Sequence, residues 1–220
     1  MQIVIPLYDQ MTALDAIGPY EALNRISGTQ ITFVGERVGE IRTDTGRLGL
    51  TVDAPLEAFP HPDVLVVPGG IGSRALAKDD RWVAWAREAH EHTTWTTSVC
   101  TGAMLLGAAG ILEGLRATTH WSCVAQMADY GATPVGDERI VREGKVITAA
   151  GVSAGIDMGL WLAAQIADED TARAAQLMIE YAPEPPFDGG TLATTPQSAF
   201  AKLPDMIVPA EAELAAANAT

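Results

Sequence analysis

The feature that most constrains this sequence is an abrupt change of pattern at Cys100. A β-type run at residues 95–99 ends there, and a run of small and apolar residues with helical character follows at residues 102–112. A residue at such a strand-to-helix turn is forced out of the sheet, as in the nucleophile elbow of serine hydrolases. The helix N-terminus also favours an anion. We therefore predict that Cys100 is a nucleophile with a strained backbone and a thiolate that forms easily.

Strand-like and helix-like segments alternate along the chain, which predicts an α/β fold with a mostly parallel sheet flanked by helices. Strands are expected at residues 2–8, 30–34, 63–67 and 95–99, with hairpins at 39–52 and 139–148. Further helices are expected at residues 13–26, 79–90, 122–130, 153–167 and 170–181. We expect one flavodoxin-like domain over residues 1–220, in which 190–220 form a C-terminal extension that frays from Ala210 onward.

Composition limits the partners of the chain. Of the 220 residues, 48% are hydrophobic and 19% charged, and the net charge is −14. Such an acidic chain is not expected to bind nucleic acid or an anionic membrane surface. No secretory signal is expected, because residues 1–6 lack a basic region and their apolar run is too short. No membrane span is expected, because the longest apolar run, 99–112, is too short. Two cysteines make no disulfide framework and no metal-ligand spacing, so we expect a cytoplasmic protein without metal or cofactor.

Two further segments are expected at the edge of the sheet where the strands at residues 2–8 and 95–99 end. Asp15 opens the first helix after a strand, and from there it could reach Cys100 as a proton donor and acceptor. The alternative is an ordinary first-turn or N-cap acid. Gly69 and Gly70 follow another strand, where they form an oxyanion hole or simply a tight turn.

Other motifs are weaker. Residues 151–155 read Gly-x-Ser-x-Gly, but all four histidines precede Ser153, whereas the histidine follows the serine in serine hydrolases of that type. His120 suggests a Cys–His pair, or equally a histidine held within a turn. Cys123, inside an expected helix, is interpreted as structural.

Several motifs together resemble the PfpI superfamily, which is related to class I glutamine amidotransferase domains. They are VVPGG at 66–70, SVCTG at 98–102, ATTHW at 117–121 and AGID at 154–157. Two more, LDAIGP at 14–19 and EYAPEPPF at 180–187, resemble the isocyanide (isonitrile) hydratase branch. The resemblance covers nearly the whole chain, from Gln2 to about Gly190.

The resemblance implies roles for individual residues. Cys100 matches the nucleophile, Thr101 its neighbour and Asp15 the acidic partner. Protease-like and glyoxalase-like members usually carry histidine where this chain has Thr101 and glutamate where it has Asp15, so those activities are not expected here. Members fused to an AraC-type regulator add a helix-turn-helix, and the roughly thirty residues after Gly190 are expected to be too few and too acidic for one. A homodimer is expected from the family.

The expected reaction is addition of water to an isocyanide, giving an N-substituted formamide through a cysteine thioimidate. Thr101 would hydrogen-bond the sulfur, Asp15 or water, and backbone N–H groups near Gly70 and Val152 would stabilise the thiolate or the developing anion. Two alternatives remain open: a cysteine-based redox or stress-response protein, and a small-molecule-binding module without chemistry.

Overall fold

The computed structural model describes residues 1–204 and 206, so the expected fraying after Ala210 lies outside the described residues. A seven-stranded sheet forms the centre, in the order β10-β11-β7-β6-β1-β2-β5. Its strands are β1 (Gln2–Pro6), β2 (Gln30–Gly35), β5 (Ala54–Pro55), β6 (Val64–Val67), β7 (Trp95–Val99), β10 (Ile140–Glu143) and β11 (Val146–Ala149). Neighbours pair in parallel except β10, which pairs antiparallel with β11. The mostly parallel sheet predicted from the sequence is confirmed.

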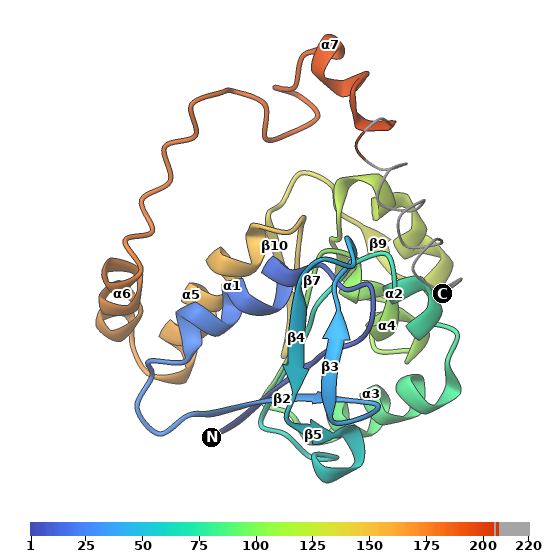
Figure 1. The fold of residues 1–220 in the computed structure, drawn as a ribbon, viewed down its shortest axis with the longest axis vertical. Helices are drawn as coiled ribbons and strands as arrows, with labels where there is room; N and C mark the ends of the chain where they lie inside the picture. The colour runs from blue at the N-terminus through green and yellow to red at the C-terminus, as the bar shows by residue number, and fades with distance from the viewer. Residues whose placement is uncertain (205, 207–220) are drawn as a thin grey trace.

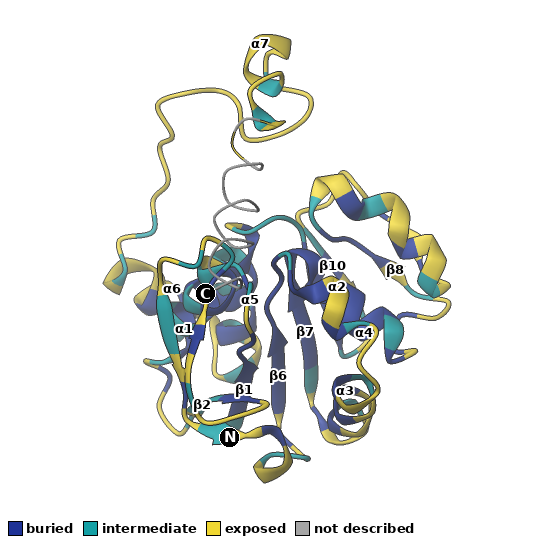
Figure 2. Cartoon of the chain, turned by 45° about the vertical axis from the view of Figure 1, so that its right-hand side comes forward, coloured by how far each residue is buried: buried dark blue, intermediate teal, exposed yellow. Residues whose placement is uncertain are grey.

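The central strand β6 is apolar because both faces of the sheet are covered. Every residue of β6 and of β11 is buried. Strands buried on both sides read as continuous apolar runs, which is the pattern seen at residues 64–67. Helices α1 (Ala13–Leu23), α5 (Ala154–Ile166) and α6 (Glu169–Met178) lie on one side of the sheet, and α2 (Ser73–Leu76), α3 (Asp80–His92) and α4 (Ala103–Ala108) on the other (Figure 2).

Smaller elements complete the body. They are the hairpin of β3 (Gly39–Arg42) with β4 (Gly49–Val52), the pair β8 (Arg116–Ala117) with β9 (Thr133–Pro134), and the 3-10 helices η1 (Leu56–Ala58), η2 (Cys100–Gly102) and η3 (Trp121–Tyr130). After α6 the chain runs exposed and away from the body to α7 (Gln197–Phe200), as Figure 1 shows. No helix in residues 1–204 combines the length and apolarity needed to cross a bilayer.

Four helix predictions were wrong in length or type. The first helix, α1, ends at Leu23 rather than residue 26. The helix after Cys100 ends at Ala108 rather than residue 112, since Gly110 adopts a left-handed φ of 78°. The helix expected at 122–130 is a 3-10 helix, stopped as predicted by Gly131 at φ 74°. The last one, α6, ends at Met178 instead of residue 181.

Candidate active site

Cys100 lies where β7 ends, and its backbone is strained. Its φ is 54°, in the left-handed region that a non-glycine residue rarely adopts. Two hydrogen bonds hold this conformation: the N–H of Cys100 donates to the carbonyl of Ala150 at 2.8 Å, and the hydroxyl of Thr119 donates to the carbonyl of Cys100 at 2.6 Å. The strained turn predicted from the sequence is confirmed.

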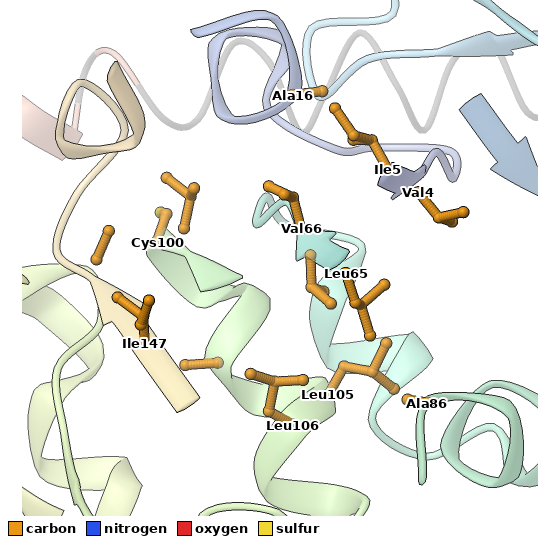
Figure 3. Packing of buried hydrophobic residues seen from close by; sticks show 14 of the residues in the cluster. Val4, Ile5, Ala16, Leu65, Val66, Ala86, Cys100, Leu105, Leu106 and Ile147 are labelled. Carbon is orange, nitrogen blue, oxygen red and sulfur yellow. The ribbon is translucent and has the colours of Figure 1, made fainter. Parts of the chain in front are cut away.

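The chain beyond Cys100 passes very close to the end of β6. A Cβ at Gly102 would lie 2.2 Å from the carbonyl oxygen of Val67, so only glycine fits there. Cys100 itself is 5% exposed and belongs to the buried cluster drawn in Figure 3, which includes Val66 and Ile147. The nucleophile candidate is therefore enclosed by the ends of neighbouring strands.

Asp15 supplies a carboxyl group to the same place. It is fully buried in the first turn of α1, and its Oδ2 accepts a 2.8 Å hydrogen bond from the N–H of Gly69. Oδ1 is also buried and has no hydrogen-bond partner of standard geometry. Burial raises the pKa of Asp15 from 3.8 to about 7, whereas the Gly69 N–H and the Cys100 thiol act to lower this pKa. The carboxyl faces the thiol rather than capping its helix.

The expectation that the Cys100 thiolate forms easily was wrong, because the folded protein raises the pKa of this thiol instead of lowering it. Burial and the nearby Asp15 charge raise the pKa of Cys100 to about 12, although N–H groups of Thr101 and Val152 and the Thr101 hydroxyl act to lower it. The helical dipole is weak here because η2 has three residues and α4 six. Thiol and carboxyl titrate as a pair that keeps one proton near neutral pH.

Thr101 and Gly70 are joined to each other. The Thr101 hydroxyl donates to the Gly70 carbonyl at 3.0 Å, and the Gly70 N–H donates to Thr101 Oγ1 at 2.9 Å. Ser73 Oγ donates to the same carbonyl at 2.8 Å. The N–H of Gly70 is thus directed at Thr101, whereas the N–H of Val152 interacts with the Cys100 sulfur.

The remaining candidates lie beside this centre. The imidazole of His120 contacts Ser122 Oγ at 2.8 Å through Nδ1, and no hydrogen bond among residues 1–204 joins it to Cys100. Ser153 Oγ accepts from Arg139, with no histidine partner among the described residues. Cys123 is buried, with its Sγ 3.4 Å from Arg74 Nη2.

Sequence reasoning assigned no separate role to Thr119 and did not foresee that Gly69 would bond Asp15. The signal for Thr119 lay within the ATTHW segment, where a hydroxyl stands beside His120. Nothing in the local sequence indicates that this hydroxyl reaches a carbonyl 19 residues away. Among the described residues, no group of three or more histidine, cysteine or acidic side chains could hold a metal ion.

The fold and the site define a class: an α/β protein whose strained cysteine is paired with a buried carboxyl at the carboxyl edge of a parallel sheet. The chain belongs to the DJ-1/PfpI family, whose model matches residues 1–165. The superfamily resemblance inferred from its motifs is therefore confirmed.

Individual relatives are also similar. The chain is 41% identical to the isonitrile hydratase of Pseudomonas putida over 90% of this chain and 86% of that protein. A crystal structure of a ThiJ/PfpI family protein from Pseudomonas syringae has a TM-score of 0.87 and 37% identity, covering 96% of this chain and 89% of that one. Drosophila melanogaster DJ-1beta shares the fold, with a TM-score of 0.75 and 20% identity over 83% and 98% of the two chains.

Proposed function

We propose that this chain is an isocyanide hydratase, an enzyme that converts an isocyanide and water into an N-substituted formamide. The observation that carries the proposal is the pairing of Cys100 with buried Asp15, in a chain 41% identical to an isonitrile hydratase. The reaction needs a nucleophile and a proton at the same carbon atom. A thiol and a carboxyl that hold one proton between them supply both.

In the first step the Cys100 sulfur attacks the terminal carbon of R–N≡C. The reactive form of the pair has the proton on Asp15 and the charge on sulfur, because a neutral carboxyl no longer opposes the thiolate. A carbon–sulfur bond forms, and the Asp15 proton moves to the same carbon. The product of this step is a thioimidate, R–N=CH–S–Cys100, and Asp15 is left as a carboxylate.

In the second step water adds to the thioimidate carbon. The Asp15 carboxylate takes a proton from water as the hydroxyl adds, and that proton passes to the nitrogen, giving R–NH–CH(OH)–S–Cys100. In the collapse the hydroxyl proton goes to Asp15 and the carbon–sulfur bond breaks. R–NH–CHO leaves, and the starting form of the pair, thiolate with neutral carboxyl, is restored.

Backbone groups stabilise the charge on sulfur. In this proposal the N–H groups of Thr101 and Val152 are the donors. Gly70 acts one step away, because its N–H fixes the Thr101 hydroxyl at 2.9 Å. Thr101 thereby places its own N–H at the sulfur, and its hydroxyl remains near enough to act on Cys100.

The redox alternative is less well supported by this site. Reactive sensor cysteines are accessible and have a low pKa, whereas Cys100 is 5% exposed and its pKa is raised to about 12. We also infer a small-molecule substrate, no nucleic-acid partner, no cofactor, a homodimeric assembly and a cytoplasmic location. The net charge of −14 supports the second of these inferences.

The test is hydration of a simple aryl isocyanide, followed by absorbance, with formamide identified by mass spectrometry. Wild type should turn over, while Cys100→Ala and Asp15→Ala should lose turnover. Cys123→Ala is the matched control, since it removes the other thiol, and it should keep wild-type activity. Absence of formamide from wild type with a reduced Cys100 would overturn the proposal in favour of binding or redox chemistry.

A further inference from the structure

His120 has a fixed proton pattern that the mechanism above does not use. Its Nδ1 accepts a hydrogen bond from the backbone N–H of Ser122, at 3.4 Å, and also contacts Ser122 Oγ at 2.8 Å. A backbone N–H can only donate, so Nδ1 carries no proton. The ring is therefore the tautomer that bears its proton on Nε2.

The surroundings keep this imidazole neutral. Burial is the larger cause and the positive charge of Arg74 the second, and both lower the pKa of His120. A neutral ring with an Nε2–H group is a donor without a formal charge. Such a group can polarise a bound molecule without competing for the proton that the cysteine and the carboxyl hold between them.

Two neighbours place the ring at the site. The hydroxyl of the preceding residue, Thr119, donates a hydrogen bond to the Cys100 carbonyl at 2.6 Å. On the other side, a Cβ at Gly151 would lie 3.2 Å from His120 Cδ2 and 3.9 Å from Nε2, so the ring packs directly on this glycine. The next residue, Val152, directs its N–H to the Cys100 sulfur.

Aromatic side chains also lie beside the imidazole. The ring centroids of His120 and Trp121 are 5.2 Å apart, and those of Trp121 and Phe200 are 5.7 Å apart. The contact with Gly151 and the neighbouring indole leave the imidazole little freedom to turn. A donor held in this way is suited to a defined position on a substrate.

We propose that the Nε2–H of His120 hydrogen-bonds the nitrogen of the substrate-derived thioimidate. This inference rests on the proposed function and adds a residue that touches the reacting group. An isocyanide nitrogen has no free lone pair, whereas the thioimidate nitrogen gains one when sulfur and hydrogen have added to carbon. A donor at that nitrogen draws electron density from the carbon and favours attack by water. The proton of His120 stays on His120, so the atom balance of the reaction is unchanged.

The experiment compares His120→Phe with His120→Gln in the full-length protein. Phenylalanine keeps a flat ring on Gly151 but removes the donor, while the glutamine amide nitrogen can donate from nearly the position of Nε2. We expect kcat for an aryl isocyanide to fall by roughly tenfold or more in His120→Phe, with KM falling alongside it and kcat/KM little changed, since the bond forms only after the covalent step. His120→Gln should recover most of that loss.

Two further measurements make the result specific. The rate at which iodoacetamide alkylates Cys100 should match wild type in both variants, which shows that the nucleophile is intact. The melting temperature should fall by a similar amount in both, because both lose the Nδ1 atom that accepts from the Ser122 N–H. His92→Phe, an exposed histidine on α3, is the control and should change nothing. Turnover by wild type with equal kcat in His120→Phe, or an equal loss in both His120 variants, would overturn this inference alone. Absence of wild-type turnover would overturn the proposed function together with it.

Discussion

The hydroxyl of Thr119 donates a 2.6 Å hydrogen bond to the carbonyl oxygen of Cys100, and this bond ties the strained turn after β7 to the segment before η3. Thr119 is 1% exposed, so no water replaces the hydroxyl if it is removed. Thr119→Val keeps the shape but leaves that carbonyl short of a donor. We expect the free energy of unfolding, measured with urea, to fall by about 1–3 kcal/mol.

The conservative variant separates hydrogen bonding from packing. Thr119→Ser keeps the hydroxyl and loses one methyl group, so it should lose less stability than the valine variant. Turnover should follow the same order, because the bond helps to hold Cys100 at φ 54°. A valine variant as stable and active as wild type would show that other contacts hold the turn.

Gly69 is a second position at which a small substitution should reduce activity. A Cβ there would lie 2.5 Å from the backbone nitrogen of Thr101 and 2.9 Å from Oδ2 of Asp15, so one of them has to move. We expect Gly69→Ala to lower kcat/KM by about 100-fold, since a shift of about 1 Å in the acid has effects of that size. Gly190→Ala, where a Cβ meets nothing within 4 Å, is the matched control and should behave as wild type.

The sequence was informative where local chemistry decides the structure. The apolar run that became β6 follows from side chains close in the chain. The strained Cys100 could likewise be predicted, because a strand that stops at a helix start requires a sharp turn. These features need no knowledge of distant contacts.

The features that could not be predicted depend on distant residues. The Asp15 carboxyl is set by a Gly69 N–H that is 54 positions away, and the raised pKa of Cys100 depends on burial and on that carboxyl. The helix dipole argument considers only the turn after the cysteine, and it therefore gave the wrong direction for the shift of the Cys100 pKa. The 3-10 geometry of η3, capped at its start by the His120 side chain, was equally hidden in an ordinary helical pattern.

The pH dependence of turnover follows from the shared proton of Cys100 and Asp15. The proposed reactive form holds one proton, so activity should rise as the pair loses its first proton, near the Asp15 pKa of about 7. It should stay high over a broad range above this, because the second proton leaves only near the Cys100 pKa of about 12. A kcat/KM profile between pH 5 and 10 measures the acidic limb. A profile that is flat through pH 7 would contradict a proton shared between these two groups.

Replacing Asp15 by asparagine should separate nucleophile strength from catalysis. The Asp15 charge is the second cause of the raised Cys100 pKa, so Asp15→Asn should lower the thiol pKa. The pH at which iodoacetamide alkylation of Cys100 reaches half its maximum should therefore fall, while turnover is lost because no acid remains. Cys123→Ala in both backgrounds removes the competing thiol. An alkylation profile that does not move would show that burial alone sets the Cys100 pKa.

Asp15→Asn should also change how the free energy of unfolding varies with pH, and the raised pKa of Asp15 sets the direction of this change. Burial raises that pKa from 3.8 to about 7 on folding, so the unfolded chain loses this proton first as pH rises. The stabilisation present below pH 3.8 is therefore lost progressively and is gone above about pH 7, a decline of up to about 4 kcal/mol. Asp15→Asn has no proton to lose there, so its unfolding free energy, measured with urea at intervals from pH 4 to 8, should fall less steeply. Its stability relative to wild type should then rise across this range, and parallel curves would mean that Asp15 titrates at its ordinary pKa in the folded protein.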